Sequence, residues 1–242
     1  NQVRLTAKKL MVISRYTSEL NMDSVMSVGD DLAYEIAYAF AEKEDDCGIN
    51  GDGTGTYGRI TGIRSALSAA AGSPTTTSAG GVIIGAGNAY SELTLANFHS
   101  VVGILPQYAD TPNTSWLVHK VFWATVMQRL AFAQGGSTAG ELQAGGRYEF
   151  LGYPVTISQK MPSTEGNSQV CALLGDFTLG ASFGDRSLDS VDFSTEAYVN
   201  SQSLWERDEI GIRGTERFDI NVHDVGNTTT AGPIVGLQTL NS

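Results

Sequence analysis

The sequence has 242 residues, a length that suits one large domain or two small ones, and 41% of them are hydrophobic, enough to form a core. It has no run of 18 or more apolar residues and no signal-peptide pattern, so we expect a soluble, intracellular protein without a membrane-spanning helix. Fifteen Lys and Arg against 26 Asp and Glu give a net charge of −11, and the absence of a basic run disfavours direct binding to a phosphate backbone.

Charged residues make up only 17% of the chain, which suits a protein that gives much of its surface to neighbouring subunits, because interface cores are depleted in Lys, Glu and Asp. Cys47 and Cys171 lie far apart and are interpreted as buried thiols, not a disulfide. The chain begins with Asn1, so we expect a processed or excised fragment of a longer protein.

The first predicted elements are a short extended segment followed by a helical turn over Thr6 to Leu20, and then a long helix over Ser24 to about Asp46. Asp23 or Ser24 can cap that helix, and Gly48 can end it. Its apolar residues recur at spacings of three and four, as an amphipathic helix requires; they are Val25, Val28, Leu32, Ile36 and Phe40.

The segment Ile49 to Leu67, INGDGTGTYGRITGIRSAL, predicts a turn leading into a strand. Gly53 to Gly58 matches the dinucleotide-binding pattern G-x-G-x-x-G, but that fingerprint needs a strand before it and a helix after it, whereas a helix precedes it here. We therefore expect a glycine turn with positive φ and no bound cofactor. Ala66 to Gly87, rich in small residues, predicts a loop or domain crossover.

The middle of the chain predicts an α+β region. We expect helices over Leu93 to Leu105 and Lys120 to Phe132, the second burying Val121, Phe122, Ala124, Val126 or Met127, and Leu130. Strands are expected over Trp116 to His119, Phe150 to Ser158 and Val170 to Phe177, with a Gly-rich loop over Gln134 to Gly146.

The last clear element is a strand over Glu209 to Val222, where apolar even positions alternate with polar odd ones. Glu216 is the one charge on its apolar face.

One pattern points to an enzyme. Gly180 to Gly184 matches the nucleophile elbow G-x-S-x-G, and Ser182 is followed by Asp192, Asp219 and His223 in the order of α/β-hydrolases. The elbow needs a helix directly after the serine, whereas Asp185 to Tyr198 alternates like a strand. A serine esterase using Ser182 and His223 remains the enzyme alternative.

The three histidines, His99, His119 and His223, stand singly without metal-ligand spacing. The sequence thus indicates no catalytic, cofactor-binding or metal residue. Trp205, in the polar loop NSQSLWER, is either a contact residue or packed within its own subunit.

Three segments, in order, resemble the tailed-bacteriophage major capsid proteins with the Hong Kong 97 fold. The first is the long helix followed by INGDGTG and Gly62-Ile63. The second holds Trp116-Leu117-Val118, Arg147-Tyr148, LGYPV at Leu151 to Val155, and Met161-Pro162. The third is Leu174 to Phe177, followed by the long strand with Glu216-Arg217-Phe218.

The resemblance implies an α+β fold with a long spine helix. Residues 1–65 and 177–230 would form a peripheral domain with a sheet, and residues 66–176 and 231–242 an axial α+β domain. The family's N-terminal arm and extended loop would precede residue 1. Its cross-linking Asn and Glu positions fall near Asp208 and Thr215, so self-cross-linking is not expected.

By the same resemblance, the protein is a structural capsid subunit and not an enzyme. Copies would assemble as pentamers and hexamers into an icosahedral shell around double-stranded DNA, without sequence-specific binding and without a membrane. Scaffolding, maturation protease and portal proteins would be its other partners, and it would assemble in the host bacterial cytoplasm into the virion capsid. An encapsulin-like nanocompartment shell protein is the alternative, which neighbouring genes would distinguish.

The resemblance places the loop from Asn200 to Arg207 at the contact between capsomers. The candidate subunit-interface residues are Asn200, Gln202, Leu204, Trp205 and Arg207.

Overall fold

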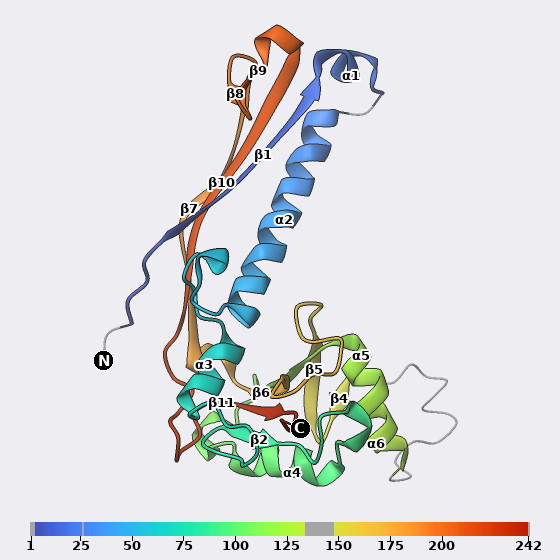
Figure 1. Cartoon of the computed structure of the whole chain (residues 1–242), viewed down its shortest axis with the longest axis vertical. Coiled ribbons are helices and arrows are strands. Elements are labelled where there is room, and N and C mark those ends of the chain that lie inside the picture. Colours follow the sequence, from blue (N-terminus) through green and yellow to red (C-terminus); the bar gives the residue numbers. More distant parts are fainter. Residues whose placement is uncertain (1–2, 26, 134–147, 242) are drawn as a thin grey trace. The chain divides into compact units, whose positions relative to one another are not determined.

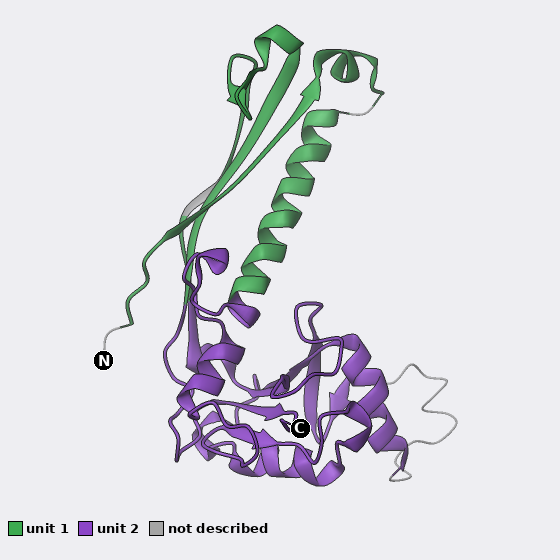
Figure 2. Cartoon of the chain, viewed as in Figure 1, with its two compact units in different colours: residues 1–47, 183–220 green, residues 48–182, 221–242 purple. Residues whose placement is uncertain are grey.

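The structure is a computed structural model, and it describes residues 3–25, 27–133 and 148–241. The chain forms two compact units, each built from two segments (Figure 2). Unit 1 consists of residues 1–47 and 183–220, and unit 2 of residues 48–182 and 221–242. The chain therefore passes from unit 1 to unit 2, returns to unit 1 and ends in unit 2.

Unit 1 is a three-stranded sheet with one long helix (Figure 1). The strands lie in the order β1 (Lys8–Thr17), β10 (Glu209–Val222), β7 (Ala181–Ser194). Strand β1 runs antiparallel to β10, from Lys8 opposite Phe218 to Thr17 opposite Glu209. The helices are α1 (Ser18–Asp23) and α2 (Val28–Asn50), and a hairpin of β8 (Tyr198–Val199) and β9 (Gln202–Ser203) joins β7 to β10.

Helix α2 packs on one face of the sheet through a small cluster in which Ile36, Phe40 and Ile212 are buried. The two elements approach closely at Gly214, where an added Cβ would lie 2.4 Å from Cγ2 of Ile36 and 3.0 Å from Cζ of Phe40. Even positions of β10 face this cluster, which confirms the predicted strand and its alternation. Glu216, at one of these positions, is buried and only 4% exposed.

The long helix is confirmed, but its bounds are not as predicted. Val25 precedes it and is fully exposed, and Gly48 lies inside it. The helix continues to Asn50 because tertiary contacts in unit 2 hold its last turn. Ile49 is buried in a core cluster there, and Nδ2 of Asn50 donates to the carbonyl of Lys160 at 2.8 Å.

Unit 2 is built on a six-stranded mixed sheet (Figure 1). Its strand order is β2 (Val82–Ile84), β11 (Ile234–Gln238), β6 (Val170–Gly175), β3 (Ser115–Val118), β5 (Tyr153–Ile157), β4 (Glu149–Phe150). The β2–β11 and β3–β5 pairs are parallel and the others antiparallel. Its helices are α3 (Ile63–Ala70), α4 (Leu95–Ile104), α5 (Lys120–Phe122), a π-helical turn (Trp123–Met127), α6 (Gln128–Ala133) and α8 (Phe177–Gly180).

Both faces of this sheet are covered by apolar side chains. Val235 and Leu237 of β11 join one cluster with Phe98 and Trp116, whereas Ile234 joins a second cluster with Leu67. Every residue of β6 and β11 is buried. Buried strands of this kind read as continuous apolar runs, as VCALLG does.

The turn after the long helix is confirmed, but the strand predicted to follow it is wrong. Gly53 and Gly58 have positive φ, and a bridge joins Asp52 to Thr61. Helix α3 then begins at Ile63, because Ile63 and Leu67, four residues apart, lie on one face and are both buried.

Within the predicted helix over 120–132, the buried set differs from expectation. Val121 is 42% exposed and Ala124 is exposed, while Trp123 is buried with Phe122, Val126 and Met127. The π turn adds a residue to the helical period, which rotates the inward face. The predicted loop over 134–146 lies outside the described residues.

The units also differ from the predicted domain boundaries at 65, 177 and 230. Residues 48–65 pack with unit 2 because Ile49 and Ile63 belong to its core.

Candidate assembly surface

Exposed apolar side chains are concentrated on unit 1. Nineteen large apolar side chains are exposed among the described residues, and fourteen of them belong to unit 1, which holds about a third of the chain. Large exposed apolar patches mark interaction sites. The fourteen are Val3, Leu5, Met11, Ile13, Leu20, Met22, Val25, Tyr34, Tyr38, Phe183, Val191, Phe193, Tyr198 and Trp205.

The core of unit 1 is correspondingly small. Its cluster contains three buried residues, against seventeen and eleven in the two clusters of unit 2. A thin core beside a large exposed apolar surface is the arrangement expected of a unit that is completed by contacts with other chains.

The predicted contact loop forms a tight hairpin. Strands β8 and β9 pair antiparallel, and the two linking residues, Asn200 and Ser201, have φ of 52° and 63°. Positive φ at both central positions gives a turn whose twist matches that of the strands. A 3₁₀ turn over Trp205–Arg207 follows and leads into β10 through Asp208.

Of the five candidate interface residues, four are exposed: Asn200, Gln202, Trp205 and Arg207. The fifth, Leu204, is fully buried, so that side chain is not available to a neighbouring subunit. It packs within unit 1, where an added Cβ on Gly211 would lie 2.7 Å from its Cδ1. Trp205 is 77% exposed and is therefore not a core residue of its own subunit.

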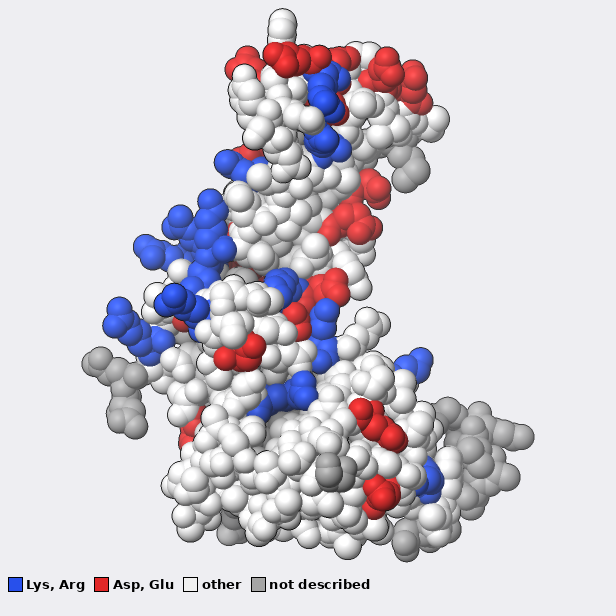
Figure 3. Space-filling view, viewed as in Figure 1, with Lys and Arg blue, Asp and Glu red and all other residues white. Residues whose placement is uncertain are grey.

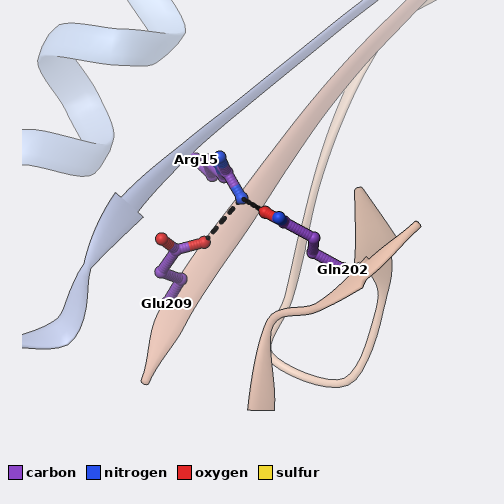
Figure 4. Close-up of polar contacts among 3 residues, drawn as sticks. All are labelled: Arg15, Gln202 and Glu209. Atoms are coloured by element: carbon purple, nitrogen blue, oxygen red, sulfur yellow. Dashed lines mark hydrogen bonds and ion pairs between the residues drawn. The ribbon is translucent and has the colours of Figure 1, made fainter. Parts of the chain in front are cut away.

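Arg15 ties the hairpin to the sheet (Figure 4). Its Nη1 donates to Oε1 of Gln202 at 3.3 Å and to Oε2 of Glu209 at 3.1 Å. The backbone N–H of Ser18 adds a bond of 2.9 Å to the carbonyl of Asp208. These bonds join the residues on both sides of Trp205 to β1 and to Ser18.

Two charged surfaces of unit 1 were not found by sequence reasoning. Lys and Arg side chains lie along its strands and acidic side chains along α2 (Figure 3). Lys9 faces Arg217 across the β1–β10 pair, and Nη2 of Arg213 forms an ion pair of 2.8 Å with Asp192 of β7. The basic surface could have been recognised from the cations at odd positions of β1 and β10, because alternate residues of a strand lie on one face of the sheet.

The esterase pattern is not built as a catalytic site. Ser182 lies inside strand β7, so the strand-to-helix turn of a nucleophile elbow is missing, as the sequence alternation predicted. Asp192 is engaged by Arg213, and Asp219 accepts from the backbone N–H of Thr6 at 2.5 Å.

The histidines are likewise single residues. His99 is exposed on α4, His223 is exposed after β10, and Nδ1 of His119 accepts from the N–H of Val121 at 3.1 Å. No group of three potential metal ligands occurs among the described residues.

Two open pockets of unit 2, of about 280 and 390 Å³, are each lined by an arginine that donates hydrogen bonds to backbone carbonyls. In the first, Nε of Arg64 donates to the carbonyl of Val170 at 3.0 Å. In the second, Arg129 donates to the carbonyls of Ser91, Tyr90 and Leu93 at 2.9 to 3.1 Å. Arg64 thus ties α3 to β6, and Arg129 holds the segment 90–93 against α6.

Comparisons with known proteins agree with a structural subunit. The model of the family described as "Phage capsid family" matches residues 1–226. No curated protein matches the chain. No helix of the described residues is long and apolar enough to cross a membrane.

Solved structures from phages and from a GTA particle share the fold over almost the whole chain. A chain of "Mycobacterium phage Bobi" has a TM-score of 0.67 at 18% identity, covering 98% of this chain and 73% of that one. A chain titled "Capsid of empty GTA particle computed with C5 symmetry" has a TM-score of 0.71 at 20% identity, with coverages of 98% and 74%. A chain of "Microbacterium phage Oxtober96" has a TM-score of 0.70 at 15% identity, and the match covers 97% of this chain and 73% of that one. The expected α+β capsid fold is confirmed.

Proposed function

The chain belongs to the phage capsid family, and from this premise we propose that it is a major capsid subunit that assembles as pentamers and hexamers into an icosahedral shell enclosing double-stranded DNA. Unit 1 would be the peripheral domain and unit 2 the axial domain. The shell would assemble in the host bacterial cytoplasm, with scaffolding, maturation protease and portal proteins as further partners.

The observation that carries this proposal is the distribution of apolar surface. Fourteen of nineteen exposed large apolar side chains lie on unit 1, whose core cluster contains only three buried residues. Stable contacts between proteins bury about 800 Å² on each partner, and this unit supplies apolar surface for such contacts. Its work would be mechanical.

The test is assembly of the purified protein. Sedimentation velocity and negative-stain microscopy should show rings of five and six subunits or closed shells. A protein that remains monomeric at all salt and protein concentrations contradicts the proposal. Shells that form but enclose a protein cargo instead of DNA in the producing cells would favour the encapsulin-like alternative.

A further inference from the structure

Helix α2 carries an exposed stripe of two acidic and two aromatic residues. Asp31, Tyr34, Tyr38 and Asp45 recur at spacings that place them on one face, away from the buried Ile36 and Phe40. Tyr34 is 71% exposed and Tyr38 is 59% exposed. With a rise of about 1.5 Å per residue, the two acids lie about 21 Å apart with the tyrosines between them.

The open face of the sheet in the same unit carries cations near both ends, one of which, Arg15, is also ion-paired with Glu209 at 3.1 Å. Along β1, the odd residues Lys9, Met11, Ile13 and Arg15 point to this face, and Met11 and Ile13 are 49% and 47% exposed. At about 3.4 Å per residue, Lys9 and Arg15 lie about 20 Å apart. The order along β1 is cation, apolar, apolar, cation, and its length matches the stripe on α2.

Strand β10 adds positive charge to this face. Arg217 lies directly opposite Lys9, and like charges in opposite positions destabilise a strand pair. Arg213 is a fourth cation on this face, and it is paired with Asp192 at 2.8 Å. Arg15 is held by Gln202 and Glu209 through Nη1 alone, so its Nε and Nη2 groups are not used in those bonds. Acidic groups from outside the subunit would relieve the repulsion.

We propose that the α2 stripe of one copy docks on the open sheet face of a second copy. This contact rests on the proposed function, and it would join neighbouring subunits within a capsomer. Asp31 and Asp45 would meet the cations at the two ends, and the tyrosines would cover Met11 and Ile13 between them. Arginine beside a tyrosine ring adds a favourable cation–π contact.

The contact uses two different surfaces of the same unit, so it is heterologous. Heterologous contacts place copies head to tail and close into rings when the rotation between copies allows. A single contact of this kind can thus be repeated five or six times around a capsomer.

DNA is the competing occupant of the basic face, and the surface fits it less well. Met11 and Ile13 stand exposed between the cations, and Asp192 lies beside Arg213. A phosphate backbone has no group that would cover these apolar side chains, whereas tyrosines would.

The experiment exchanges the charges of the two surfaces. The sheet variant carries Lys9→Glu and Arg217→Glu, and the helix variant carries Asp31→Lys and Asp45→Lys. Each alone should raise the protein concentration needed for assembly at least tenfold in sedimentation velocity. The fourfold variant, with acids on the sheet and lysines on the helix, should assemble again. An equal mixture of the two double variants should form rings of six, in which the two variants can alternate, but not rings of five.

A matched control carries Arg59→Glu and Lys120→Glu, which make the same charge change on exposed residues of unit 2. This control should assemble like the wild type. Thermal unfolding of every variant below the assembly concentration should give melting temperatures within a few degrees of the wild type, because all the altered side chains lie at the surface of the subunit.

The proposal is wrong if both double variants assemble like the wild type. It is also wrong if the fourfold variant has a wild-type melting temperature but needs as high a protein concentration for assembly as the double variants do. A sheet variant that assembles fully but loses DNA retention would assign the face to nucleic acid instead. Those results leave the capsid function standing. A wild-type chain that never assembles refutes the capsid function and this contact with it.

Discussion

Replacing Trp205 with alanine tests whether this residue serves assembly or folding. The side chain is 77% exposed in the subunit, so only about a quarter of its surface is covered. A tryptophan offers up to about 250 Å², and at about 25 cal/mol per Å² the covered quarter contributes about 1.5 kcal/mol at most. We therefore expect Trp205→Ala to lower the free energy of unfolding of the monomer by less than about 1.5 kcal/mol.

Docking against a neighbour would bury the remaining three quarters, worth about 4 to 5 kcal/mol by the same coefficient. Interface tryptophans commonly cost 2 kcal/mol or more when truncated. Because 1.4 kcal/mol is a tenfold change in an equilibrium constant, Trp205→Ala should weaken each such contact at least about thirtyfold.

The adjacent residue supplies the control. Leu204 is fully buried, so Leu204→Ala should destabilise the monomer by about 2 to 5 kcal/mol. Denaturant unfolding of both monomeric variants, beside sedimentation of assembled particles, separates the two roles. The reasoning fails if Trp205→Ala unfolds the monomer as readily as Leu204→Ala does, or if its particles form at wild-type concentrations.

Three further predictions concern DNA, thiols and pH. The isolated subunit should not shift duplex DNA at moderate salt, because its net charge is −11; nanomolar, salt-sensitive binding would refute this. Burial raises the pKa of the Cys171 thiol to about 12 and also raises that of Cys47, so both thiols should react with Ellman's reagent at pH 8 only after unfolding. Hydrogen bonds from Thr178 and Thr111 lower the pKa of Asp176. Its carboxylate therefore stabilises the fold above the unfolded pKa of about 3.9 and loses that effect as pH falls through the lower folded pKa. Asp176→Asn should destabilise the protein at pH 7, and denaturant melts of variant and wild type should converge once the pH has fallen below the lowered folded pKa of Asp176.

The elements found correctly from sequence are those whose periodicity is local. The alternation from Ile210 to Val222 fixes a strand because each side chain reports the face on which it lies. Leu32, Ile36 and Phe40 report the helix in the same way, and all three pack in the cluster of unit 1.

The errors come from contacts that local patterns do not contain. Helix α2 continues past Gly48 because Ile49 is buried in unit 2, and α3 replaces a predicted strand because Ile63 and Leu67 fill the same core. Because of the π turn, Trp123 is buried in place of Val121. The spacing of apolar residues in the sequence does not indicate the extra residue of that turn. Tertiary packing outweighs local propensity at each of these sites.

The candidate surface was predictable in part. Trp205 could be proposed as a contact residue because it is a large aromatic in a polar loop, and it is exposed. Leu204 in the same loop is buried, and the composition of the loop does not distinguish it from a contact residue. The basic sheet face was missed because its members come from distant segments. Lys9 and Arg217 become neighbours only through the register of β1 with β10.

The position of β11 in the sheet of unit 2 sets when the subunit can be finished during synthesis. This strand, Ile234–Gln238, lies between β2 and β6, and all its residues are buried. Until residue 238 has left the ribosome, β2 has no partner strand, and the edge of β6 that pairs with β11 stays open. An open edge invites pairing with other chains. During synthesis the sheet of unit 2 therefore stays incomplete until β11 has emerged, although its other five strands precede β11 in the chain.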